Sequence, residues 1–376
     1  MNIYPNFYKD FSCIAGDCNA TCCADWKIGI EKETYNKYQK ISGEFGAFVQ
    51  ENIDSDHFFN MTEDNKCPFL NESGLCRIYI ECGEDWLSTT CTRFPRRWAT
   101  IDRFDFFGLS LSCEEVLHLL HHLDTKCELS IEGKVEHSKR ESSFLLLLEW
   151  GMTLLQNEDI PFGISLSALC YLGSMAFDFW KENNYEEVYT TLAQLPSVLQ
   201  EFSLAKEDLS EEELRQLALD HIFHVTDTFN QIIFKSALPK CDHYLCEAAY
   251  FQMSDEQRKD YISQRVEQQR ELLKENTLSR RLAAAFFLAR LIIYTESSEH
   301  IFTASFANYI LLSHIMPLTW SQDIRCDEGK YLATAARMNR LFDKSRAIQK
   351  FVWPVIKDLF EPDILTYAMT FMYIFR

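Results

Sequence analysis

The stretch CIAGDCNATCC, residues 13–23, places four cysteines within eleven residues of a 376-residue chain. The chain has 14 cysteines, and ten of them precede residue 128. Cysteine used as a small apolar core residue would be spread more evenly along the chain. This clustering indicates that the thiols of the first 127 residues act together.

The N-terminal sequence and the apolar stretches suggest a compartment. The first residues, MNIYPNFYKDFSC, have no basic segment, apolar core or small-residue cleavage site of the secretory type. The longest apolar stretches, 164–177 and 282–294, are too short to span a bilayer and are expected to be buried helices. We therefore expect a cytoplasmic protein that does not enter a membrane. In a reducing cytoplasm, clustered thiols indicate metal ligands or catalytic groups rather than disulfides.

The charge distribution argues against one class of partner. The formal net charge is −19, and residues 1–127 alone carry 12 basic and 20 acidic side chains. Nucleic-acid binding needs a basic stripe for the phosphates, so we expect no nucleic-acid partner. At 47% hydrophobic residues, the chain can bury a large core and is not expected to be disordered.

Glycine usage separates two parts of the chain. Eight of the 12 glycines lie at or before Gly133, and the glycine-poor remainder suits helices better than alternating strands and turns. Two helix starts have a capping-box pattern, Ser210 with Glu213 and Ser254 with Gln257. The helices expected in this part span 144–156, 165–181, 210–234, 254–275, 277–295, 301–315 and 330–342.

The first part of the chain mixes short apolar runs with Cys, Pro, Gly and Asp. The elements expected there are a strand and then a helix in 26–41, a strand in 104–113 and a helix in 111–123. We predict a mainly α protein, in which a cysteine-rich metal-binding N-terminal module (1–127) packs on a helical C-terminal array (128–376).

Eight thiols are the candidate metal ligands. They are Cys13, Cys18, Cys22, Cys23, Cys67, Cys76, Cys91 and Cys113. Thiolates are soft ligands, and four that converge suit either tetrahedral zinc or an iron–sulfur cluster. Spacing alone leaves the metal open, and it leaves open whether there are two sites or one site with additional structural thiols. Cys82 and Cys127 are two further thiols of this part.

The order of these motifs resembles the flagellin lysine-N-methylase family, which belongs with a wider group of cysteine-rich putative zinc- or iron-chelating proteins. The resemblance rests on four blocks. They are C-x4-C-x3-CC-x2-W-x-I (13–28), CPFL followed by GLC-x-I (67–78), GE-x2-LS-x2-C-x2-FPR (83–96) and LSLSCEE (109–115). Segment 299–317 is similar to the C-terminal region of the family.

The resemblance implies an activity and its cofactors. It implies transfer of methyl groups from S-adenosylmethionine to lysine side chains of a protein substrate, flagellin, with an iron–sulfur cluster (4Fe–4S) held by the cysteines. The chain has no G-x-G-x-x-G motif, so an S-adenosylmethionine site must be built in another way, for example at an open iron. A polar displacement needs a deprotonated lysine, whereas a radical route relaxes that need.

Further residues near the cysteines are weaker candidates. Arg93 and Arg96 follow shortly after Cys91 and are expected to bind the cofactor, because arginine holds carboxylates or phosphates and offsets thiolate charge. Trp26 is expected to pack over the metal loop. The histidines of 118–122 are expected to be ordinary helix residues, Glu114 and Glu115 to favour a helix N-terminus, and Cys241 with Cys246 not to form a metal site. No catalytic residue is identified.

Two other functions remain open from the sequence. One is a zinc-stabilised helical adaptor without catalysis, whose helical array binds a protein partner. The other is a redox or metal-handling protein, which would oxidise its thiols reversibly and have no affinity for S-adenosylmethionine.

Overall fold

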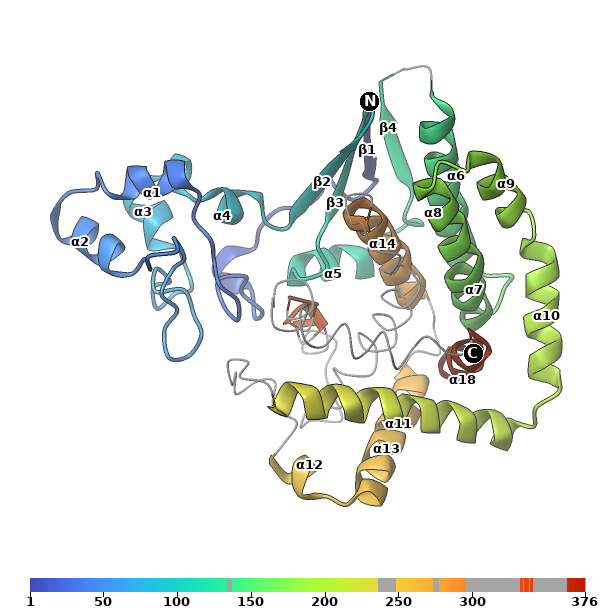
Figure 1. Ribbon diagram of the computed structural model, residues 1–376. Helices are drawn as coiled ribbons and strands as arrows, with labels where there is room; N and C mark the ends of the chain where they lie inside the picture. The colour runs from blue at the N-terminus through green and yellow to red at the C-terminus, as the bar shows by residue number, and fades with distance from the viewer. Residues whose placement is uncertain are drawn as a thin grey trace.

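A computed structural model of the chain describes residues 1–133, 137–235, 248–272, 277–294, 332–333, 335–337, 339–340 and 364–375. This part is mainly helical with one small sheet, which confirms the predicted class (Figure 1).

The sheet has four strands in the order β2-β3-β1-β4. The strands are β1 (Asn2–Pro5), β2 (Arg96–Ile101), β3 (Phe104–Leu109) and β4 (Leu129–Glu132). β2 and β3 form an antiparallel hairpin, β1 runs parallel to β3, and β4 runs antiparallel to β1. The sheet thus takes strands from both sides of residue 127, and the division into two domains at that position stays a prediction.

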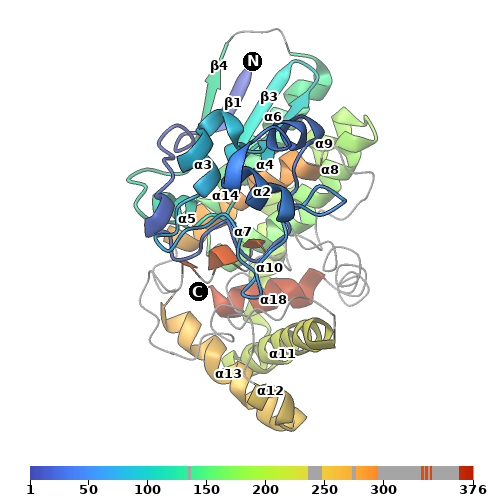
Figure 2. The same ribbon diagram turned by 90° about the vertical axis from the view of Figure 1, so that its left-hand side faces the viewer.

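A small lobe projects away from the sheet (Figures 1 and 2). It contains α1 (Lys32–Tyr38), α2 (Gly43–Glu51), α3 (Arg77–Cys82) and α4 (Thr89–Arg93), with short 3-10 turns at Ala15–Asp17 and Glu84–Trp86. The lobe has its own hydrophobic core, which consists of Ile28, Ile30, Tyr38, Val49, Phe59, Cys67, Phe69 and Ile78.

A second, larger core joins the sheet to the remaining helices. These are α5 (Glu114–His121), α6 (Lys139–Leu155), α7 (Phe162–Ala168), a π-helical turn (Leu169–Gly173), α8 (Ser174–Lys181), α9 (Tyr185–Leu192), α10 (Leu195–Glu207), α11 (Glu211–Lys235), α12 (Ala248–Gln252), α13 (Asp255–Leu272), α14 (Thr277–Tyr294) and α18 (Ile364–Ile374). α14 packs on α5, α6 and the β2–β3 hairpin. It therefore connects the helical part to the elements that carry the cysteines.

Most expected elements are present where the structure describes the chain. The helices predicted in 144–156, 165–181, 210–234, 254–275, 277–295 and 111–123 and the strand predicted in 104–113 are confirmed. Both capping boxes form, since Ser210 and Ser254 bond to Glu213 and Gln257. The strand expected at the start of 26–41 is wrong, because Gly29 makes only an isolated bridge to Phe58. The helix predicted at 301–315, segment 299–317, most of 330–342, Cys241 and Cys246 lie outside the described residues.

One helical stretch of the described residues, Phe162–Lys181, is long and apolar enough to cross a membrane by length and composition. Its apolar window is 72% buried inside the protein. That burial is expected for a core helix, as predicted for 164–177.

Candidate thiol-lined site

The eight candidate cysteines line one cavity of about 650 Å³ between the small lobe and α5. The residues so placed are Cys13, Cys18, Cys22, Cys23, Cys67, Cys76, Cys91 and Cys113. Cys82 and Cys127 are not in the lining. The fold therefore brings together thiols that are 100 residues apart in sequence, and their role as metal ligands stays a prediction.

Close backbone packing positions the loop that carries Cys13 and Cys18. The 3-10 turn Ala15–Asp17 lies between them, and the Ala15 amide donates to Cys13 Sγ over 3.4 Å. A Cβ on Gly16 would lie 2.5 Å from the Ser73 carbonyl oxygen, so only glycine lets this loop approach the turn that precedes Cys76.

The other thiols lie in loop segments that are paired by backbone hydrogen bonds, or at the starts of helices. The Cys67 amide donates to the Cys23 carbonyl over 2.7 Å, which joins the two segments directly. Cys76 and Cys113 are the N-cap residues of α3 and α5. Cys91 lies in α4, where its amide donates to the N-cap hydroxyl of Ser88 over 3.3 Å.

Glu114 binds the cysteine loop, a role that the sequence did not indicate. Its carboxylate is 1% exposed. It accepts hydrogen bonds from the Ala20 amide at 2.6 Å, the Asn19 side-chain amide at 3.1 Å and the Cys18 thiol at 3.3 Å. The carboxylate therefore fixes the loop beside Cys113, in addition to any effect on the start of α5.

We expect Glu114→Ala to lower the free energy of unfolding by about 2–3 kcal/mol, because buried donors of the loop lose their acceptor. Urea unfolding under anaerobic conditions measures this. Glu115→Ala, one position further on the same helix, is the matched control and should change stability by less than about 0.5 kcal/mol. Equal losses in both variants would contradict the role of the Glu114 carboxylate.

Burial and mutual contact control the protonation of the thiols. Burial raises the pKa values of Cys67, Cys91 and Cys113 to about 12. The pKa of Cys22 is lowered to about 7, first by the hydrogen bond from the Cys23 thiol and then by the positive charge of Arg340. The same pairing raises the pKa of Cys23. A metal must therefore displace protons from most of these thiols, so that its binding strengthens as the pH rises.

Two polar groups have no hydrogen-bond partner among the described residues, one that lines the cavity and one on a residue that binds the loop lining it. Tyr38 is fully buried and lines the cavity, and its hydroxyl is unpaired. The second group is Nε of Arg340, a fully buried residue that the sequence did not single out. Among the unpaired buried polar atoms of the described residues, the Tyr38 hydroxyl is the one that lines the thiol cavity, so it is available as a donor to a group bound there.

A metal centre in this cavity is a prediction of the sequence, and on that prediction the effect of Tyr38→Phe on stability should depend on the metal. With the metal removed by a chelator, the substitution should stabilise the protein by about 1–2 kcal/mol, because it removes an unsatisfied hydroxyl. In the metal-loaded protein this gain should vanish, because the hydroxyl then has an acceptor. Urea unfolding of both forms measures the difference. Tyr35→Phe on the same helix, where the ring stacks on His57, is the control. A gain of equal size in both forms would place the hydroxyl away from the metal.

The thiols surround the cavity and do not converge on a point. Across the described ranges, no group of three or more His, Cys, Asp or Glu side chains has an arrangement that could hold a metal ion. The imidazole rings of His118 and His122 are stacked, with their centroids 6.4 Å apart.

The two arginines predicted to bind the cofactor lie at a smaller cavity of about 240 Å³. It shares part of its lining with the thiol cavity, namely Trp26, Thr90, Phe94, Pro95 and Arg96. Both guanidinium groups are exposed and lie over aromatic rings, Arg93 at 4.1 Å from the centroid of Trp98 and Arg96 at 5.0 Å from that of Phe11. Arg96 therefore reaches both cavities, and Arg93 only the smaller one.

Trp26, expected to cover the metal loop, lines both cavities. Its indole donates to the Cys22 carbonyl over 2.6 Å, and its ring lies 6.2 Å from that of Phe94. The indole therefore forms the wall between the thiols and the arginines.

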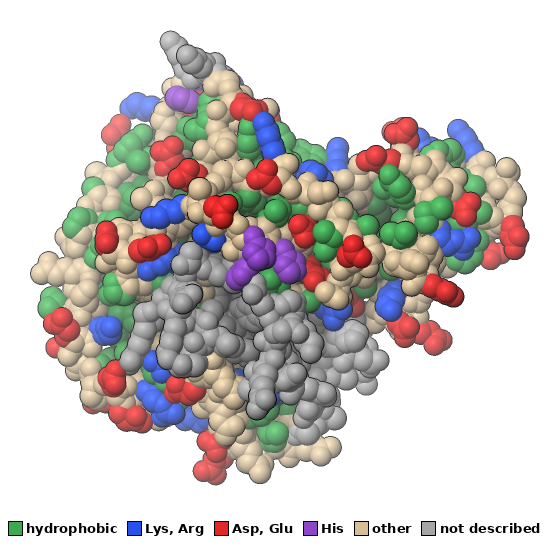
Figure 3. All heavy atoms as spheres, turned by 180° about the vertical axis from the view of Figure 1, so that it is seen from behind, with side chains coloured by type: hydrophobic (Ala, Val, Ile, Leu, Met, Phe, Trp, Pro, Cys, Tyr) green, Lys and Arg blue, Asp and Glu red, His purple; other side chains and the backbone are tan. Residues whose placement is uncertain are grey.

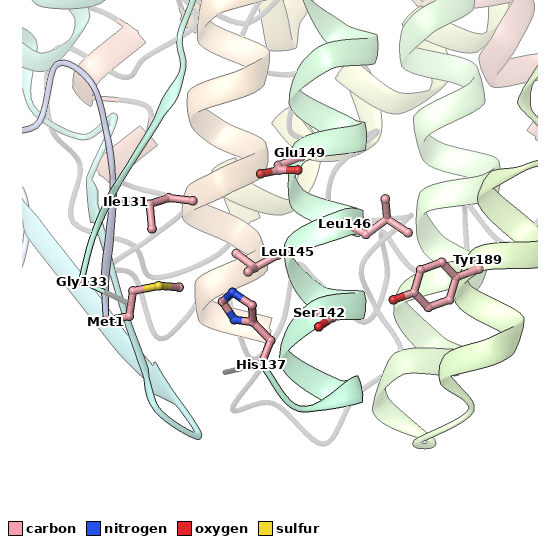
Figure 4. Close-up of a pocket in the computed structure, with 9 residues that line it drawn as sticks. All are labelled: Met1, Ile131, Gly133, His137, Ser142, Leu145, Leu146, Glu149 and Tyr189. Carbon is pink, nitrogen blue, oxygen red and sulfur yellow. The ribbon is translucent and has the colours of Figure 1, made fainter. Parts of the chain in front are cut away.

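Two other surface features lie away from the thiols. A cavity of about 690 Å³ near the N-terminus is lined by residues that include Met1, His137, Glu149 and Tyr189 and contains no cysteine (Figure 4). On the face shown in Figure 3, the Lys and Arg side chains of the described residues are scattered among Asp and Glu without a continuous basic stripe. The absence of a nucleic-acid partner stays a prediction.

The fold and site define a mainly helical protein with a thiol-lined cavity. Two curated lysine-N-methylases, from Salmonella choleraesuis strain SC-B67 and Salmonella typhimurium strain LT2, are each 25% identical to the chain over 264 residues. The match covers 64% of the chain and 64% of each relative, so the chain spans somewhat less than two thirds of their length. The flagellar biosynthetic protein FliU of Salmonella muenchen is 34% identical over 121 residues, which are 30% of the chain and 72% of that protein.

The chain belongs to the lysine-N-methylase family, as its cysteine motifs predicted. No model of a protein family and no solved structure matches the chain.

Proposed function

We propose that this protein transfers methyl groups from S-adenosylmethionine to lysine side chains of a flagellar protein, with an iron–sulfur cluster bound in the thiol-lined cavity. The observation that carries the proposal is the gathering of eight thiols around one cavity in a chain similar to lysine-N-methylases. The flagellar substrate is inferred from the name of the FliU relative.

The donor set fits a cluster better than a single zinc ion. Zinc needs four sulfurs at about 2.3 Å from one point. The thiols instead stand around a cavity of about 650 Å³, and each thiolate of a cluster binds its own iron, which tolerates a wider separation. The unpaired hydroxyl of Tyr38 supplies a hydrogen-bond donor to such a group.

Four of the thiols are the ligands we favour. Cys23, Cys67, Cys76 and Cys91 all pack within or against the hydrophobic core of the small lobe. A buried apolar shell excludes water and oxygen from a cluster and influences its potential. Cys13, Cys18, Cys22 and Cys113 form the remaining thiol wall, next to Glu114 and Arg340.

The residues around the cavity suggest how the reactants are held. A bound iron–sulfur cluster supplies a redox-active iron centre that also accepts ligand atoms. Arg96, at the junction of both cavities, is placed to bind the carboxylate of S-adenosylmethionine. In a polar transfer, the lysine ammonium must lose its proton before nitrogen attacks the methyl carbon and the methyl–sulfur bond breaks. Apolar walls such as Phe94 and Leu87 favour the neutral amine by desolvation.

The proposal is tested on the full chain purified without oxygen. Matched amounts of iron and acid-labile sulfide, and transfer of a labelled methyl group from S-adenosylmethionine to lysines of flagellar filament protein, are the expected results. A colourless protein with stoichiometric zinc would overturn the cluster and favour the helical adaptor. A loaded cluster without labelled lysine would overturn the reaction with this substrate.

A further inference from the structure

Arg340 is a buried arginine that binds the cysteine loops through their backbone. It is 0% exposed. Its terminal nitrogens donate to four carbonyl oxygens, those of Thr21 at 2.5 Å, Ala20 at 2.6 Å, Ser112 at 3.1 Å and Ala24 at 3.3 Å. Three of these carbonyls flank the pair Cys22-Cys23, and the fourth directly precedes Cys113. One guanidinium from the C-terminal part of the chain thus joins two thiol-bearing segments that are 90 residues apart in sequence.

In the described part of the chain no acidic side chain forms an ion pair with Arg340, and its Nε proton has no acceptor there. A buried, unpaired charge is costly, and carbonyl oxygens offset only part of that cost. Cys22 directly follows Thr21, whose carbonyl accepts from this guanidinium. Thiolate-ligated iron–sulfur clusters carry net negative charge, which is the missing counterpart.

We propose that Arg340 is the positioning residue and counter-charge of the metal centre in the thiol-lined cavity. It holds the two cysteine loops at fixed distance through their carbonyls, and its positive charge stabilises the reduced, more negative form of the centre. This inference rests on the proposed iron–sulfur cluster. It makes loading of the N-terminal thiols depend on the C-terminal part of the chain.

The test compares Arg340→Gln and Arg340→Lys in the full chain purified without oxygen. Iron and sulfide content, loss of iron to a chelator, and the midpoint potential from a redox titration are measured. Arg340→Gln should retain iron about 10-fold less tightly and should have a more negative midpoint potential. Arg340→Lys, which keeps the charge, should have a potential close to that of the unchanged protein although its hold on the loops is weaker.

The matched control is Arg337→Gln, because Arg337 donates to the Asn19 carbonyl of the same loop at 2.5 Å but is only partly buried. Its potential should be unchanged. An unchanged potential and iron content in Arg340→Gln would overturn the inference, as would a Lys variant whose potential falls as far as that of the Gln variant. Should Arg340→Gln fail to fold, the Lys variant decides alone, and a clear negative shift in its potential would count against the counter-charge. Absence of iron from the unchanged protein would instead overturn the proposed cluster.

Discussion

Cys67→Ser and Cys91→Ser are each expected to abolish stable iron binding by the anaerobically purified protein. Cys67 is buried and Cys91 partly buried, and both line the cavity and pack with the core of the small lobe. A serine hydroxyl is a hard, weakly acidic group and a poor ligand for iron in a cluster. The loss of one ligand should remove most of the iron and the sulfide together, and both are measured by chemical analysis of the same sample.

The chain supplies its own control for these substitutions. Cys82 ends α3, six residues after Cys76, yet it does not line the cavity. Cys82→Ser should therefore keep its full complement of iron and sulfide. Retention of iron by both Cys67→Ser and Cys91→Ser would exclude these thiols as ligands and would shift the site toward Cys13, Cys18, Cys22 and Cys113.

The eight thiols singled out in the sequence all line one cavity, although the segments that carry them are far apart in the chain. The resemblance of four short blocks to one family separated Cys82 and Cys127 from the eight thiols of the cavity. The helices could be predicted because their apolar periodicity and their capping residues are visible in short stretches of the sequence. The sequence showed no trace of β1 and β4, because a strand of four residues leaves too short a pattern.

The residues that organise the site were missed for a different physical reason. Glu114 was expected to act on its own helix, but its carboxylate accepts from a loop 94 to 96 residues earlier in the chain. Arg340 lies more than 300 residues from the carbonyls of the Cys22-Cys23 loop. Long-range partners of a backbone carbonyl leave no periodicity in the sequence. Arg340 stands three residues after Arg337 and beside Asn339, so the sequence did not distinguish it from a surface arginine.

These long-range bonds bear on how the thiols are assembled. The loop of residues 13–23 has little secondary structure of its own, and a flexible loop with four thiols would lose much conformational entropy on binding a metal. Glu114 and Arg340 restrict that loop in complementary ways. The Glu114 carboxylate accepts from N–H and S–H donors of the loop, and the Arg340 guanidinium donates to carbonyl oxygens of the loop. The fold thereby orders part of the loop before any metal binds, so that the loop loses less conformational entropy on binding.

Glu141→Gln is expected to lower the free energy of unfolding at neutral pH by about 3 kcal/mol, because it breaks a buried, charged hydrogen-bond network. The carboxylate is fully buried at the start of α6 and accepts from three nitrogens of Arg103, at 2.6, 3.0 and 3.2 Å. It also closes the capping box with Ser138. Arg103 lies between β2 and β3, so this network joins the sheet to the helical part.

The size of this loss should depend on pH in a defined direction. The hydrogen bonds from Arg103 lower the pKa of Glu141 from 4.5 to about 2. A carboxyl group whose pKa is lower in the folded protein stabilises the fold above its unfolded pKa and loses that contribution as it is protonated. The difference in stability between the unchanged protein and Glu141→Gln should therefore be constant above about pH 4.5 and shrink toward pH 2. Urea unfolding over this range measures it, with Glu149→Gln on the exposed side of α6 as a control that follows the unchanged protein. A difference that stays constant down to pH 2 would mean that glutamine disturbs the packing of α6 and that the carboxylate charge contributes nothing.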